Sequence, residues 1–157
     1  MWIKLIGALF LMASGGAVAY FLNRGIERRI AQTEALVSLV KLFRVQIDCY
    51  CVPIGEIFRR ADTTLLEKCG FNGTPRDSEA FRSMLEKSTP RDVASVLSSF
   101  ADELGSSYRE EQLKSCDLHT ARLNEILSKQ KADARPQKKL NTVLCLSAAA
   151  GIVILFI

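Results

Sequence analysis

The sequence predicts an all-α protein in which an antiparallel bundle of five or six cytoplasmic helices lies between an N-terminal and a C-terminal transmembrane helix. Three observations support this fold class. All 17 Asp and Glu residues, and 20 of the 21 Lys and Arg residues, fall between Arg24 and Lys139. Each end of the 157-residue chain is an apolar segment. No stretch of the middle shows the sustained alternation that is typical of a strand. We therefore divide the chain into residues 1–23, 24–139 and 140–157.

The two terminal segments have the length of membrane spans. Leu5 to Leu22 and Leu140 to Ile157 each comprise 18 uncharged residues. A helix needs roughly 20 apolar residues, and at least about 17, to cross the hydrocarbon core of a bilayer. Trp2 and Tyr20 lie near the ends of the first segment, where amphipathic rings favour the membrane boundary. Because backbone groups in lipid must form hydrogen bonds internally, both segments are expected to be helices.

Basic residues flank both spans on the side of the middle segment, and cytoplasmic flanks are typically the basic ones. They are Arg24, Arg28 and Arg29 after the first span, and Lys129, Lys131, Arg135, Lys138 and Lys139 before the second. The rule predicts a two-span protein of the cell membrane with the bulk of the chain in the cytoplasm and both termini outside. Membrane lipids are expected partners, because anionic headgroups attract such cations. The middle carries 20 basic and 17 acidic residues, a balance that does not favour nucleic acid.

A second interpretation of the first segment is a secretory signal. Ala17-Val18-Ala19 has the small-x-small form of a cleavage site after an apolar core. Lys4 is the only charge before that core, and the basic cluster after the segment argues for retention as a span. The alternative protein would be an exported helical domain with a cleaved signal and a C-terminal membrane anchor.

Small residues recur four positions apart in both spans, which lets two helix backbones approach closely in lipid. The pairs are Ala13 with Ala17, Gly15 with Ala19, and Ser147 with Gly151. We expect these residues to contribute to packing between spans. The pattern does not distinguish pairing within one chain from pairing between copies in a homo-oligomer.

The first helix of the middle segment is expected over residues 26–51, which lack Gly and Pro. Its apolar positions alternate spacings of four and three, and Arg44 interrupts this stripe. Leu36, Leu39 and Phe43 widen the stripe beyond a coiled-coil seam, which indicates packing in a globular bundle. The helix could continue directly from the first span.

The remaining helices are placed by Pro, Gly and capping residues. Pro53 ends or kinks the first helix and opens a second with apolar positions from 54 to 66, followed by a loop over residues 70–76. A short helix is expected over residues 78–86. Thr89 is expected to cap a fourth helix that has Pro90 at its first position.

The last cytoplasmic helix is expected to follow a turn at Gly105, because glycine adopts the left-handed conformation that ends many helices. Ser107 and Glu110 have the spacing of a capping box at its start. Pro136 is expected to break or bend this helix just before the membrane.

Nothing in the sequence indicates a catalytic, cofactor-binding or metal site. The chain has one histidine, His119, which is expected to be solvated, and it has no Cys-x-x-Cys pair or phosphate-binding loop. The five cysteines are expected to be reduced, with Cys49 and Cys51 as buried apolar thiols. Intermixed charges are typical of a solvated helical surface. The protein is therefore expected not to be an enzyme.

Two stretches resemble a known family. They are the helix opening Pro53-Ile54-Gly55-Glu56-Ile57-Phe58 and the segment from Phe100 to Gln112 that contains Leu104 and Gly105. With the terminal spans, they make nearly the whole chain resemble stage III sporulation protein AB. Tyr108 stands where that family usually has Asp, and Cys145 where it tends to have Gly. The family is similar to a cytoplasmic domain of the inner-membrane platform proteins of type II secretion and type IV pilus machines.

The resemblance implies a non-enzymatic platform in the mother-cell membrane around the forespore, within the channel that links the two cells. Its expected partners are the secretion-type ATPase of this system, stage III sporulation protein AA, and other channel components. The turns near Pro53 and Gly105 lie one long helix away from the spans, so they are the expected contact region. The candidate contact residues are Glu56, Arg59, Arg60, Gly105, Ser107 and Gln112.

Overall fold

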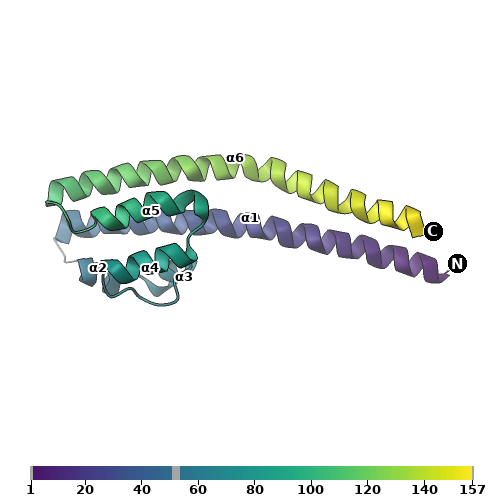
Figure 1. The fold of residues 1–157 in the computed structure, drawn as a ribbon, viewed down its shortest axis with the longest axis horizontal. Coiled ribbons are helices and arrows are strands. Elements are labelled where there is room, and N and C mark those ends of the chain that lie inside the picture. The colour runs from purple at the N-terminus through teal and green to yellow at the C-terminus, as the bar shows by residue number, and fades with distance from the viewer. Residues whose placement is uncertain (1, 51–53, 157) are drawn as a thin grey trace. The chain divides into compact units, whose positions relative to one another are not determined.

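The structure, a computed structural model, describes residues 2–50 and 54–156 (Figure 1). Within these ranges the chain forms six α-helices and no strand, which confirms the predicted all-α class. The helices are α1 (Trp2–Tyr50), α2 (Ile54–Arg60), α3 (Thr63–Lys68), α4 (Ser78–Ser88), α5 (Arg91–Glu103) and α6 (Arg109–Phe156).

The chain divides into two compact units. One unit contains residues 29–129, and the other contains residues 1–28 together with residues 130–157. Both long helices contribute to each unit, so the first apolar segment and the first bundle helix are parts of the same α1.

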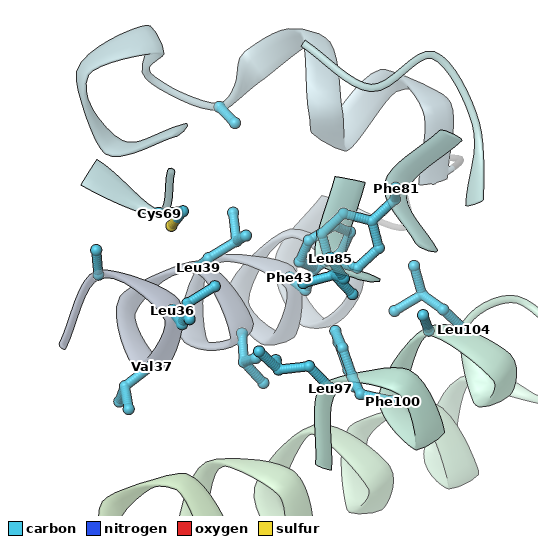
Figure 2. Close-up of a cluster of buried hydrophobic side chains, with 14 of the residues drawn as sticks. Leu36, Val37, Leu39, Phe43, Cys69, Phe81, Leu85, Leu97, Phe100 and Leu104 are labelled. Atoms are coloured by element: carbon cyan, nitrogen blue, oxygen red, sulfur yellow. The ribbon is translucent and has the colours of Figure 1, made fainter. Parts of the chain in front are cut away.

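The unit of residues 29–129 is a helical bundle around one hydrophobic core (Figure 2). From α1, the predicted wide stripe is buried, with Leu36, Leu39 and Phe43 at most 1% exposed. Neighbouring ring centroids among the core phenylalanines lie 5.0–5.9 Å apart. Full burial of one such side chain contributes about 1.5–3 kcal/mol, so this cluster is a major stabilising element of the bundle. The five rings are Phe43, Phe58, Phe71, Phe81 and Phe100.

Residues 54–66 form two short helices instead of the single helix that was expected. α2 ends at Arg60, and Asp62 in an extended conformation begins α3 by accepting a hydrogen bond from the Thr64 amide at 3.0 Å. The Thr64 hydroxyl and amide also hold the pKa of the Asp62 carboxyl below its ordinary value. The apolar spacing alone did not reveal this cap, because it continues across the break.

The expected cap by Thr89 is wrong. α5 begins at Arg91 with Pro90 at the N-cap position and no side-chain cap. Thr89 instead ends α4, because its amide donates to the Leu85 carbonyl at 3.0 Å, and its hydroxyl is buried without a partner. Only two residues connect α4 and α5. Thr89 is therefore the C-cap of α4 and cannot also be the N-cap of α5.

α6 continues through Pro136, so the helix does not break there. A bend, the other outcome that was expected, stays a prediction. Proline lacks the amide hydrogen for one intrahelical bond. Within the unit of residues 1–28 and 130–157, the residues on both sides of Pro136 make contacts. Ala134 is 7% exposed, and Lys138 forms an ion pair with Glu27. The burial of Ala134 is the more stabilising of these contacts, because an exposed ion pair contributes only about 0–1 kcal/mol.

Gln32 of α1 joins two helix ends within the bundle. Its Nε2 donates to the Cys69 carbonyl at 2.8 Å and to the Ser88 carbonyl at 2.6 Å. These carbonyls belong to the C-cap of α3 and the last residue of α4, and such groups have no partner inside their own helices. One amide therefore satisfies carbonyls at the ends of two helices.

Candidate functional site

α2 carries three of the predicted contact residues in one small cluster. Oε2 of Glu56 lies 3.6 Å from Nη1 of Arg59, and Oε1 lies 3.7 Å from Nε of Arg60. The two arginine side chains are 79% and 49% exposed. Exposed ion pairs contribute only about 0–1 kcal/mol, so the fold does not depend on this cluster. One carboxylate between two guanidinium groups leaves the surface with a net positive charge.

The opposite side of α2 is anchored in the core. Ile57 and Phe58 are fully buried, and the Phe58 ring lies 5.1 Å from Phe43 and 5.0 Å from Phe81, centroid to centroid. These anchors fix the seven-residue helix, which is too short to be stable alone. They thereby hold its charged residues in a defined position on the bundle surface.

The other three predicted contact residues lie in the turn before α6 and in the first turn of α6, where they have structural roles. Gly105 has a φ of +83°, the left-handed conformation expected after a helix end. The side-chain amide of Gln112 donates to the Ser107 carbonyl at 2.7 Å, and both residues are half-buried. Gly105, Ser107 and Gln112 therefore shape the turn more than they offer side chains to a partner.

The exposed side chain of this turn is Tyr108, which sequence reasoning did not select as a contact residue. Its side chain is 86% exposed, and its carbonyl accepts the first amide hydrogen bond of α6, from Gln112 at 3.0 Å. Tyrosine is enriched among energetically important interface residues. The sequence feature that could have singled out this position is that Tyr108 stands where the family usually has Asp.

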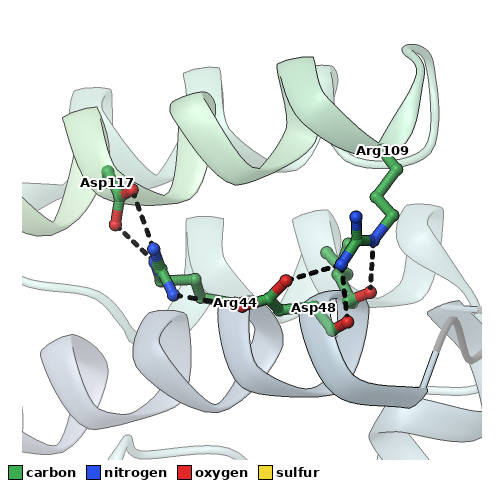
Figure 3. A network of polar contacts seen from close by, with 5 residues as sticks. Arg44, Asp48, Arg109 and Asp117 are labelled. Atoms are coloured by element: carbon green, nitrogen blue, oxygen red, sulfur yellow. Dashed lines mark hydrogen bonds and ion pairs between the residues drawn. The ribbon is translucent and has the colours of Figure 1, made fainter.

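Two ion pairs tie α1 to α6 within the bundle (Figure 3). Arg44 Nε lies 2.6 Å from Asp117 Oδ1, and a second nitrogen lies 3.3 Å from the other oxygen. Arg109 Nη2 lies 2.6 Å from the Asp48 carboxylate and 2.7 Å from its carbonyl. Arg44 also lies 3.7 Å from Asp48, which links the pairs into a network. The sequence identified Arg44 only as an interruption of the apolar stripe, because its partner on α6, Asp117, is 73 residues away.

His119 is buried, so the expectation of a solvated histidine is wrong. It is 0% exposed, its ring lies 5.5 Å from the Phe100 ring, and its Nε2 lies 3.2 Å from Glu103 Oε2. The Ser115 hydroxyl donates to the same oxygen. The hydrogen bond from Ser115, and then that with His119, holds the pKa of Glu103 below its ordinary value. Position 119 lies three residues after Cys116 and four residues before Leu123, on the apolar stripe of α6. This spacing indicates burial and was overlooked.

The buried cysteines are poor nucleophiles. Burial raises the pKa of Cys69 to about 12 and that of Cys116 to about 11, and the thiolate is the reactive form. Cys49 is exposed, which corrects its expected burial, and Cys51 lies outside the described residues. On a helix, position 49 lies far from the core stripe of α1.

A shallow cavity of about 620 Å³ lies between α4 and α5. Arg82 is in its lining and lies 2.6 Å from Asp102 and 3.4 Å from Glu86. The guanidinium is thus shared by two carboxylates within the bundle. Across residues 2–50 and 54–156, no group of three or more His, Cys, Asp or Glu side chains is placed to hold a metal ion.

In the unit of residues 1–28 and 130–157, the outer parts of α1 and α6 form an antiparallel helix pair, which we call the hairpin although no loop joins the two parts within this unit. Some of the predicted small residues lie at the contact. A Cβ added to Gly15 would lie 2.9 Å from the Ala149 Cβ and 3.1 Å from the Cys145 carbonyl oxygen. Ala19 is 4% exposed. The other predicted positions lie away from this contact. Gly151 has nothing within 4 Å of its Cβ position, and the exposed ones include Ala13, Ala17 and Ser147.

A polar layer fixes the register of this hairpin. Asn23 donates to the Thr142 hydroxyl at 3.2 Å and accepts from Asn141 at 3.4 Å. One turn further along α1, Glu27 lies 2.6 Å from Lys138 Nζ. A shift of either helix would separate these partners, so the layer opposes sliding of α1 past α6.

One helix in the described part of the chain is long and apolar enough to cross a membrane, namely the Leu9–Tyr50 part of α1. The second predicted span, Leu140 to Ile157, extends beyond the described residues at its last position. Its membrane insertion and the topology of both spans remain predictions.

Fold and site together define a class of helical protein in which two long helices each contribute to a charged bundle and to an apolar helix pair. The family model for stage III sporulation protein AB matches residues 77–157, and the chain belongs to this family. Membership assigns it a role in stage III of sporulation. Neither the curated proteins nor the solved structures yield a match.

Proposed function

We propose that the chain is a non-enzymatic platform of the sporulation channel, held in the mother-cell membrane by two spans and docking a cytoplasmic secretion-type ATPase, stage III sporulation protein AA. The observation that carries the proposal is family membership combined with a bundle that holds charged side chains on a rigid, surface-exposed α2. The likeness of this family to secretion platforms is an analogy of fold, and it supplies the expected partner.

The proposed docking surface consists of Glu56, Arg59 and Arg60 on α2 and of Tyr108 in the turn before α6. Figure 1 places α2 and the start of α6 at the same end of the bundle. The exposed cations of α2 suit an acidic patch on the partner, and such charges mainly raise the rate and specificity of association. An exposed tyrosine supplies apolar contact area at a small cost in conformational entropy.

Membrane attachment is supported by the apolar length of α1 and by the uncharged segment from Leu140. The basic flanks of both segments favour a cytoplasmic bundle. Reporter fusions in the loop of residues 70–76 and at the C-terminus test this topology. An external loop reporter would overturn the proposed arrangement.

Co-purification of the full chain with stage III sporulation protein AA tests the docking. Arg59→Glu combined with Arg60→Glu is expected to reduce capture at least tenfold, because it reverses two exposed charges that the fold does not need. Lys87→Glu with Arg91→Glu is the matched control, since these cations are exposed but lie around the α4–α5 connection. Unchanged capture by the first variant would remove α2 from the docking surface.

The alternative of a cleaved signal has a structural consequence. Cleavage after Ala19 would cut inside the continuous helix α1, beside a residue that is only 4% exposed. The intact mass of the mature chain tests this alternative. A chain beginning at Tyr20 would exclude the proposed first span.

A further inference from the structure

The net positive charge of the protein lies in the hairpin unit. Residues 1–28 and 130–157 contain seven Lys and Arg against two Asp and Glu, whereas residues 29–129 contain 14 against 15. Of the two acidic residues in the hairpin unit, Glu27 is neutralised by Lys138 at 2.6 Å. The unit therefore carries five more cations than carboxylates, and most of its cations lie at the polar ends of the two apolar segments.

The hairpin register places four of these cations on one side. Asn23 and Glu27 face α6 through their contacts with Thr142 and Lys138. Arg24, Arg28 and Lys139 each follow a contact residue by one position, and Arg135 lies one turn before Lys139. Along an α-helix, each side chain is turned by about 100° around the helix axis from the side chain before it. In two antiparallel helices that face each other, the residues that directly follow the contact residues therefore lie on the same side of the pair.

This side, which we name the cationic face, consists of Arg24, Arg28, Arg135 and Lys139. All four side chains are exposed, and the described ion pairs include none of them. Asp133, the remaining acidic residue of the unit, lies two positions before Arg135, which puts it on a different face of α6. The charge of Arg24 also acts on Glu27, which Lys138 already pairs. With that one shared carboxylate, the four cations still repel one another unless further anions screen them.

We infer that the cationic face binds the headgroups of anionic phospholipids, so that the hairpin prefers phosphatidylglycerol to zwitterionic lipid. The inference rests on the proposed membrane insertion, which sets the four cations at headgroup depth beside the uncharged segments. Phosphate groups suit both guanidinium and ammonium donors. A headgroup bound here would neutralise the excess of positive charge on this face and would fix which side of the hairpin meets acidic lipid.

The test is native mass spectrometry of the full chain, purified in detergent and supplied with equal amounts of phosphatidylglycerol and phosphatidylcholine. Bound phosphatidylglycerol is expected to predominate. Replacing Arg24, Arg28, Arg135 and Lys139 with Gln is expected to reduce this preference at least about 25-fold, which is the effect of two of the four cations when each contributes about fivefold at an anionic surface. The matched control replaces four exposed cations of the bundle with Gln, namely Arg59, Arg60, Lys87 and Arg91.

Three outcomes overturn the inference: no lipid preference in the native chain, an equal loss in the control variant, or retention of the preference by the cationic-face variant. Competition by soluble glycerol phosphate would show that the face binds phosphate and not a lipid surface, and competition by RNA would show a nucleic-acid site. Extraction of cell membranes with carbonate separates this inference from the proposed function. A native chain that stays in the membrane without a lipid preference refutes the inference alone, whereas release of the chain refutes membrane insertion itself.

Discussion

Gln32→Ala tests whether one side chain holds the ends of two helices in the bundle. The Gln32 amide donates to the carbonyls of Cys69 and Ser88, at 2.8 Å and 2.6 Å. A neutral hydrogen bond contributes about 0.5–1.5 kcal/mol net, and a buried group left without its partner costs about 1–3 kcal/mol. The two carbonyls lie at helix ends and are partly accessible to water after the change. We therefore expect a loss of about 2 kcal/mol.

Hydrogen–deuterium exchange of the full chain in detergent measures this loss locally. A change of 2 kcal/mol corresponds to about 30-fold faster exchange where amides exchange through local opening. The increase is expected at the C-terminal amides of α3 and α4, while the core part of α1 changes less.

Gln46→Ala is the matched control, because Gln46 is half-buried on the same helix and its side-chain oxygen is buried without a partner. Its removal is expected to change stability by less than about 0.5 kcal/mol. Equal exchange in the two variants would show that Gln32 contributes only its aliphatic chain. Unchanged exchange in Gln32→Ala would refute the double-cap argument.

Three further predictions concern the turn, the hairpin and pH. Tyr108→Asp supplies a capping carboxylate at the start of α6 and is expected to raise stability by about 0.5–2 kcal/mol in thermal unfolding; Tyr108→Ala should give no gain. Gly15→Val is expected to abolish oxidative cross-linking of paired cysteines placed in α1 and α6, because its Cβ would clash with Ala149, whereas Gly16→Val should preserve it. Because the folded pKa of Glu103 lies below the ordinary value of 4.5, its stabilisation is complete above that pH and is lost as the pH falls through the lowered pKa. Glu103→Gln is therefore expected to flatten the decline in thermal stability below pH 4.5, and an unchanged slope would contradict this assignment.

Much of the fold followed from patterns that are local in sequence. The wide apolar stripe of α1 and the left-handed Gly105 were predicted because spacing and backbone conformation act within a few residues. The cap at Asp62 and the end of α4 at Thr89 were missed. In both cases the helix end is set by a local hydrogen bond, from the Thr64 amide to Asp62 and from the Thr89 amide to Leu85, which the apolar spacing does not record.

The candidate site was less accessible to sequence reasoning. Glu56, Arg59 and Arg60 were selected because they follow the turn at Pro53. The structure joins them by ion pairs, because residues three and four apart share a helix face. The exposure of Tyr108 and the burial of His119 were not identified, since both depend on which side of α6 meets the core.

The sequence by itself determined that this protein is helical, that its charges lie in the middle and that its ends are apolar. These properties follow from composition and from periodicities of a few residues. Only the tertiary structure decided which small residues meet in the hairpin, where Asn23 pairs with Thr142, and that four cations lie on one side. Such pairings join residues more than 100 positions apart, and their register depends on the packing of two whole helices, which no local pattern records.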